Sequence, residues 1–175
     1  MKRFFAVLTI AAIGFSFAPK ANAIEDQWER GTMIVGAMAG FYPGIGGTLT
    51  GDYVLVDTWW RGHFTVGAQV NYRYWKHTES VQYADLAAAP RATYGLNITD
   101  KFEVHAGVMI GLGHRATTMY TGLGKTDKIK ETELGLCYGG LAGVRFFFTE
   151  NFGVQAEFNY SGYGPYANAG IAFKF

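Results

Sequence analysis

The chain has 175 residues, of which 49% are hydrophobic and 17% are charged, and its formal net charge is +1. This length predicts a single domain, and the near-neutral charge gives no reason to expect a nucleic-acid partner. The single cysteine, Cys137, excludes an intrachain disulfide. The 24 glycines, 14 phenylalanines and 11 tyrosines favour strands and tight turns over helices.

The N-terminal residues have the order of a secretory signal peptide. Lys2 and Arg3 precede the apolar run "FFAVLTIAAIGF", and the small-x-small triplet "ANA" ends at Ala23. The apolar run is shorter than the roughly 20 residues that a membrane-spanning helix needs. The sequence therefore predicts a signal peptide over residues 1–23 and an exported domain over residues 24–175, in which twelve basic and fourteen acidic residues give a net charge of −2.

The exported domain contains segments in which apolar and polar residues alternate. From Phe64 to Tyr72 every second residue is apolar or aromatic, whereas Thr65, Gln69 and Asn71 lie between them. Such alternation is typical of a β-strand whose two faces meet different environments. Eight strands are predicted on this basis, at residues 31–42, 48–57, 63–74, 84–96, 101–112, 133–147, 152–160 and 167–175.

The connections and the last strand indicate what the two faces of the strands contact. Connections after the second, fourth and sixth segments are short, and those after the first, third and fifth tend to be longer, as in transmembrane barrels. The final segment "ANAGIAFKF" alternates up to Phe175. With the signal peptide, these features resemble small Gram-negative outer-membrane β-barrels, namely the outer membrane protein A barrel, outer membrane protein X and opacity-type families.

The resemblance implies a fold, a location and partners. The fold would be all-β, an eight-stranded antiparallel up-and-down transmembrane β-barrel in the outer membrane. The chain would be a monomer that contacts outer-membrane lipid, including lipopolysaccharide, and its last strand resembles the signal that the barrel assembly machinery reads. No cofactor is expected, and four scattered histidines with one cysteine predict no metal site.

If the apolar faces meet lipid, the polar faces point into the barrel. An eight-stranded barrel has room inside only for side chains, and charges placed there must pair. The sequence therefore predicts a polar network that closes the lumen, with a narrow ion path as the alternative. Its members are expected to be Gln69, Asn71, Arg73, Arg91, Glu103, Arg145, Gln155 and Glu157.

Two parts of this prediction remain open at the level of sequence. Alternation is blurred in the first two segments, so their facing is not assigned. Pro90 falls inside the fourth segment, where it removes a backbone donor from the ladder. We expect either a bulge at Pro90 or a strand that begins at Arg91.

Function is expected at the surface. The longest connection, residues 113–132, is predicted to be an extracellular loop whose cations meet lipopolysaccharide phosphates or bind an extracellular ligand. The candidate residues for this surface are Arg115, Tyr120, Lys125, Lys128 and Lys130.

An enzyme is the alternative class, and we expect that the chain is not one. The stretches "VDTWWRG", "NYRYW" and "AEFNYSGYG" loosely resemble a lipid A deacylase family, whose catalytic His and Ser lie two residues apart near the end of the seventh strand. At the matching positions this chain has Asn159 and Ser161, and asparagine cannot act as the general base that serine needs. No catalytic residue is therefore assigned, although His77 or His114 is left as a possible substitute base.

Overall fold

The computed structural model describes residues 28–58, 62–121 and 127–175. The predicted signal peptide lies outside these residues. Within the part of the chain that the structure describes, no helix is long and apolar enough to cross a membrane.

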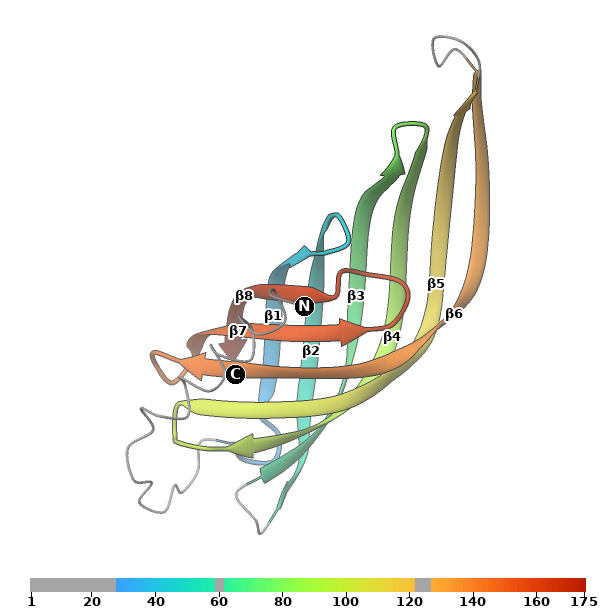
Figure 1. The fold of residues 1–175 in the computed structure, drawn as a ribbon. Coiled ribbons are helices and arrows are strands. Elements are labelled where there is room, and N and C mark those ends of the chain that lie inside the picture. The colour runs from blue at the N-terminus through green and yellow to red at the C-terminus, as the bar shows by residue number, and fades with distance from the viewer. Residues whose placement is uncertain (1–27, 59–61, 122–126) are drawn as a thin grey trace.

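The described chain forms a closed barrel of eight antiparallel strands in sequence order, in which β1 pairs with both β2 and β8 (Figure 1). The predicted fold class is thereby confirmed. The strands are β1 (Met33–Phe41), β2 (Ile45–Thr58), β3 (Gly62–Thr78), β4 (Val81–Asn97), β5 (Phe102–Thr121), β6 (Asp127–Phe147), β7 (Phe152–Tyr160) and β8 (Ala167–Lys174).

Side-chain burial follows the alternation that the sequence shows. In β7, exposed residues from Phe152 to Tyr160 alternate with buried ones at every position. In β3, Phe64, Val70 and Tyr72 are exposed on the outside of the barrel, in agreement with their predicted facing. The polar residues between them, such as Thr65, Gln69 and Asn71, are buried, so the interior side of this strand is its polar side.

The structure also assigns the facing of the first two strands. The inward side of β1 carries Ile34 and Met38, whereas the inward side of β2 carries Thr48, Thr50 and Asp52. The alternation of β1 is blurred in the sequence because its inward side is apolar as well as its outward side.

The strands on both sides of the third and fifth connections extend farther than predicted. The β5–β6 ladder continues without a register change from Arg115↔Glu133 to Thr121↔Asp127. Most of the predicted connection at residues 113–132 is therefore paired strand, and the predicted strand ends at residues 112 and 133 are wrong. The physical reason is that Thr-rich and alternating residues support strand pairing even where both faces are polar.

Pro90 lies within β4, which neither bulges at Pro90 nor begins at Arg91, so both expectations for this position are wrong. It faces outward and opposite Ala68 of β3. On the other side, the β4–β5 ladder passes from Ala88↔Leu112 to Arg91↔Met109 and skips two positions. The strand accommodates the missing donor because pairing is interrupted there while the register stays the same.

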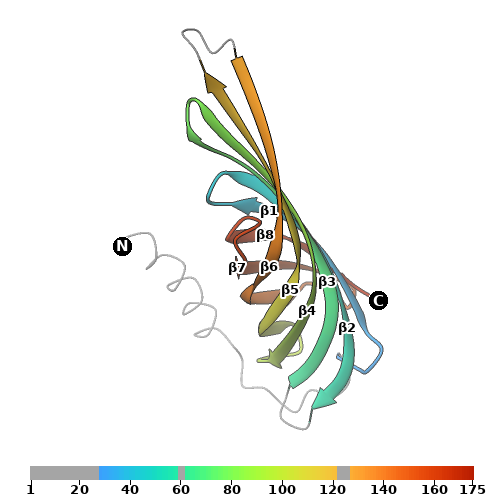
Figure 2. The same cartoon turned by 90° about the vertical axis from the view of Figure 1, so that its right-hand side faces the viewer.

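The barrel has one tall side (Figures 1 and 2). The β5–β6 hairpin reaches farthest from the end of the barrel at which the C-terminus lies, beyond the β3–β4 and β1–β2 hairpins. We call residues 115–121 and 127–133 the protruding hairpin. The ladder from β6 to β7 begins only at Gly140. Within the described chain, residues 127–139 of β6 therefore have no strand partner on that side, and we call them the open edge.

Candidate functional site

Five charged side chains from five strands meet inside the barrel. Their relative exposure is 3% or less, so bulk water does not solvate them. They reach the interior because each occupies an inward position of its strand. We call them the charged network, and they are Asp52 of β2, Arg91 of β4, Glu103 of β5, Arg145 of β6 and Glu157 of β7.

Asp52 is the centre of the network. Its Oδ1 accepts a hydrogen bond from Arg91 Nε at 2.8 Å, and its Oδ2 accepts one from Arg91 Nη2 at 2.8 Å. Arg145 Nη2 donates to the same Oδ2 at 2.5 Å. One carboxylate thus compensates two buried guanidinium groups.

The two glutamates complete the pairing of these guanidinium groups. Arg91 Nη1 and Nη2 donate to Glu157 at 3.0 and 2.8 Å, and Arg145 Nη1 donates to Glu103 Oε1 at 3.2 Å. His105 lies between both glutamates, with Nδ1 3.2 Å from Glu103 Oε1 and Nε2 3.1 Å from Glu157 Oε1. The contact between Arg91 and Glu157 is bidentate, and bidentate contacts between a guanidinium and a carboxylate are among the stronger hydrogen bonds in proteins.

The structure places all eight residues of the predicted interior network inside the barrel, but at two levels. Gln69 accepts from Arg91 at 3.1 Å, and Gln155 accepts from Arg145 at 3.1 Å, so both belong with the charged network. Arg73 and Asn71 lie nearer the extended hairpins. There Arg73 Nε donates to Asp85 at 3.0 Å.

Sequence reasoning missed both aspartates that organise these two levels. Asp52 lies in a strand whose facing was not assigned. Asp85 had an available signal, because it precedes Arg91 by an even number of residues in the same predicted strand and therefore shares its face.

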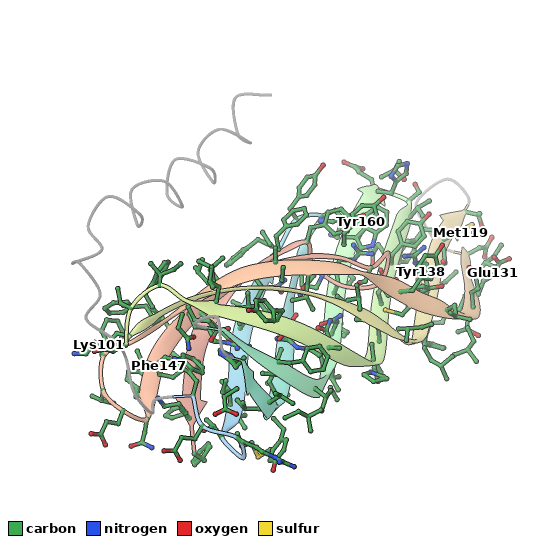
Figure 3. All side chains as sticks on the ribbon, turned by 90° about the horizontal axis from the view of Figure 1, so that it is seen from below. Lys101, Met119, Glu131, Tyr138, Phe147 and Tyr160 are labelled. Atoms are coloured by element: carbon green, nitrogen blue, oxygen red, sulfur yellow. The ribbon has the colours of Figure 1, made fainter. Side chains whose placement is uncertain are left out.

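The opposite end of the barrel, near the short turns, carries an aromatic cluster. Trp28 is buried and stacks on His63 with ring centroids 4.6 Å apart, while its edge contacts Phe147 at 5.5 Å. Lys174 Nζ lies 5.2 Å from the Trp28 ring. Figure 3 shows Phe147 at this end and Met119 with Glu131 at the other.

The predicted surface residues do not form one loop. Arg115 turns into the barrel mouth, where its Nε donates to Asp85 at 2.7 Å and its guanidinium lies 5.0 Å from the Tyr163 ring. The buried Asp85 carboxylate therefore draws the guanidinium toward the mouth, while the Arg115 side chain keeps 27% of its surface exposed. Lys125 lies outside the described residues.

The remaining surface candidates lie on the protruding hairpin. Tyr120 and Lys128 are opposite each other in the ladder, with Lys128 Nζ 5.7 Å from the Tyr120 ring. Lys128 and Lys130 are exposed and, by alternation, share the outward face with Leu134. The acidic residues of β6 lie on the opposite face of the hairpin and are Asp127, Glu131 and Glu133.

The positions compared with a deacylase show a structural arrangement. The Ser161 hydroxyl donates to the Tyr163 carbonyl at 3.1 Å. Asn159 is 1% exposed and points into the barrel. His77 and His114 are exposed on the extended strands. Among the described residues, no group of three or more His, Cys, Asp or Glu side chains is arranged to hold a metal ion.

No protein-family model and no curated protein sequence matches the chain. Its fold is similar to that of several solved structures. The N-terminal β-barrel domain of Pseudomonas aeruginosa OprF is 20% identical, with 83% of this chain and 98% of that chain covered and a TM-score of 0.48. Ail, the attachment invasion locus protein of Yersinia pestis, is 15% identical, with 83% and 97% covered and a TM-score of 0.49.

Neisserial surface protein A is 16% identical, with 82% of this chain and 94% of that chain covered and a TM-score of 0.49. No residue role is transferred at these values. The roles proposed below rest on the residues of this chain.

Proposed function

We propose that the chain is an outer-membrane β-barrel protein with a structural or surface-interaction role. The observation that carries this proposal is that large apolar side chains cover the outside of the barrel, whereas charged side chains are buried inside it. Large apolar side chains such as Val108, Ile110 and Leu136 are exposed on the wall, whereas Glu103 and Arg145 are fully buried. An apolar outer band around a polar interior suits a barrel surrounded by lipid.

Location can be tested by fractionation. Cells that express the full chain should carry it in the outer-membrane fraction, and the folded protein should migrate differently on a denaturing gel before and after boiling. Release of a soluble protein by osmotic shock would overturn the proposal. On the same proposal the chain is a monomer that the barrel assembly machinery inserts.

The lumen is proposed to be closed by the charged network. Its support is the density of contacts from Asp52 to Arg91 and Arg145, and from these arginines to Glu103 and Glu157. We expect the purified protein to show no steady unit conductance in planar bilayers. A reproducible single-channel step that a charge-removing variant such as Arg91→Met alters would favour the narrow pore instead.

The protruding hairpin is the proposed interaction surface. Lys128 and Lys130 lie on the face that continues the lipid-facing wall, so they are placed to meet the phosphates of lipopolysaccharide. No described strand pairs with the open edge, so an extended segment of an extracellular ligand could add a strand there.

The two faces of the hairpin provide a matched test. Lys128→Gln with Lys130→Gln should weaken lipopolysaccharide binding to the folded barrel, whereas Glu131→Gln with Glu133→Gln should not. Equal effects from both pairs would mean that the outward face has no special role. Replacing residues 117–131 by a tight turn tests ligand binding, since loss of binding with an intact barrel supports surface recognition.

A further inference from the structure

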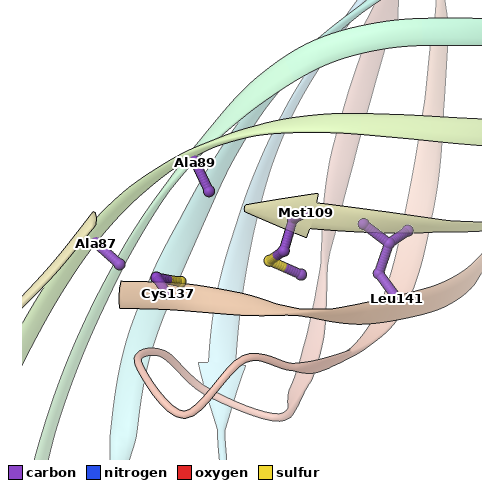
Figure 4. Packing of buried hydrophobic residues seen from close by; sticks show 5 residues of the cluster. All are labelled: Ala87, Ala89, Met109, Cys137 and Leu141. Carbon is purple, nitrogen blue, oxygen red and sulfur yellow. The ribbon is translucent and has the colours of Figure 1, made fainter. Parts of the chain in front are cut away.

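The connection between β7 and β8 enters the barrel instead of extending away from it. We call residues 161–166 the mouth loop. Ser161, Gly164 and Pro165 are buried, and Tyr163 packs against a cluster of buried residues from β4, β5 and β6. Figure 4 shows the members of this cluster facing one another, namely Ala87, Ala89, Met109, Cys137 and Leu141.

The neighbouring strands are built to accept the Tyr163 ring. Gly113 and Gly135 are opposite each other in the β5–β6 ladder. A Cβ atom at Gly113 would collide with the ring, and one at Gly135 would collide with the Tyr163 hydroxyl. The two glycines therefore leave a space that the ring fills.

The Gly162 carbonyl group joins the loop to two arginines of the strands. Gly162 O accepts hydrogen bonds from Arg73 Nη2 at 3.0 Å and from Arg115 Nη2 at 2.9 Å. Both arginines also pair with Asp85. The loop thus supplies a further acceptor to two guanidinium groups that share one carboxylate.

The mouth loop lies next to the charged network, and Asn71 stands between them, accepting a hydrogen bond from Gln69 at 3.3 Å and donating one to Tyr163 O at 3.4 Å. Its other hydrogen bonds to the strands and to the β1–β2 turn involve Asn71, Asn159, Asn168 and Tyr42, none of which is one of the five residues of that network. Gly162 and Gly164 have φ values of 75° and 131°, a region that glycine adopts without strain. Such positions can absorb backbone rotation when a loop moves.

We propose that the mouth loop is a lid that opens and closes the extracellular end of the barrel while the charged network below it stays closed. Arg73, Arg115 and Asp85 form its latch. Opening withdraws the Tyr163 ring and uncovers the upper interior, including the Cys137 thiol, which is 0% exposed in the closed barrel. This inference is independent of the hairpin's proposed ligand.

Cys137 serves as a reporter because the chain has no second cysteine. The full chain, folded in detergent micelles, is treated with a small cationic methanethiosulfonate reagent, and labelling is followed by intact mass. Arg115→Gln should raise the labelling rate about tenfold, the change expected when an opening equilibrium loses a charge-assisted hydrogen bond. His114→Gln, the adjacent residue on the outward face, should leave the rate unchanged.

Two further variants test the same lid if the Arg115→Gln variant folds poorly. Tyr163→Ala should label faster than the parent chain because the ring no longer covers the thiol. Gly162→Ala should also label faster, because nothing lies within 4 Å of its added Cβ and only the positive φ disfavours the closed loop.

The lid would be disproved if these variants kept heat-modifiable gel mobility and labelled at the parent rate. It would equally be disproved if labelling of every form followed global unfolding in urea.

Discussion

The closed part of the barrel and the protruding hairpin use the same strand alternation in different surroundings. Inside the closed part, Asp52, Arg91 and Arg145 are buried, and both arginines donate hydrogen bonds to Asp52. On the protruding hairpin, Lys128, Lys130 and Glu131 are exposed. The charges of the network are enclosed by the barrel wall, whereas charged side chains on both faces of the protruding hairpin are exposed.

The difference shows where stability and interaction are located. Buried charges must keep their partners, because an uncompensated charge in a low-dielectric interior is costly. Exposed charges on a strand edge are tolerated, and they also discourage unwanted strand pairing. We therefore expect substitutions in the closed part to affect folding and substitutions in the hairpin to affect recognition.

The largest expected effect is at the centre of the charged network. Asp52→Asn should lower the free energy of unfolding by about 3–5 kcal/mol, because two buried guanidinium groups lose their shared carboxylate. Urea unfolding in detergent micelles, followed by tryptophan fluorescence, measures the change. The matched variant Asp127→Asn on the hairpin should cause no measurable change, and similar losses for both would contradict the comparison.

A smaller effect is expected on the outward face. Val108 and Leu134 are similarly exposed, at 64% and 69%. Val108→Arg should destabilise the barrel in a lipid bilayer by about 2–4 kcal/mol, and Leu134→Arg by about 0–1 kcal/mol, if Val108 lies near the middle of the membrane and Leu134 near its surface. If unfolding experiments in bilayers gave equal destabilisation for the two variants, Val108 and Leu134 would lie at similar depths in the membrane.

The smallest effect on stability is expected at the open edge. Lys128→Ile with Lys130→Ile should leave the unfolding midpoint unchanged but increase self-association, since edge lysines discourage pairing between strands. Sedimentation in detergent micelles measures the dimer fraction. Lys101→Ile, a control at the other end of the barrel, should remain monomeric, and a dimer in both variants would point to nonspecific association.

The sequence predicted the residues of the interior better than it predicted the shape of the mouth. Period-two alternation was strong in β3, β5 and β7, so their inward positions could be read directly. The segment "DKIKETE" looked like a loop because both of its faces are charged. The connection "SGYGPY" looked like a simple turn, and its inward course depends on the paired glycines Gly113 and Gly135 in other strands.

The sequence by itself determined the number of strands and, from the third strand on, the residue types on each face, because side-chain alternation is a local property of extended backbone. Only the tertiary structure decided which charges meet. Asp52 pairs with Arg91 and Arg145, which are 39 and 93 positions away in the chain. Those pairings depend on register and on barrel closure, which bring inward positions of non-adjacent strands together.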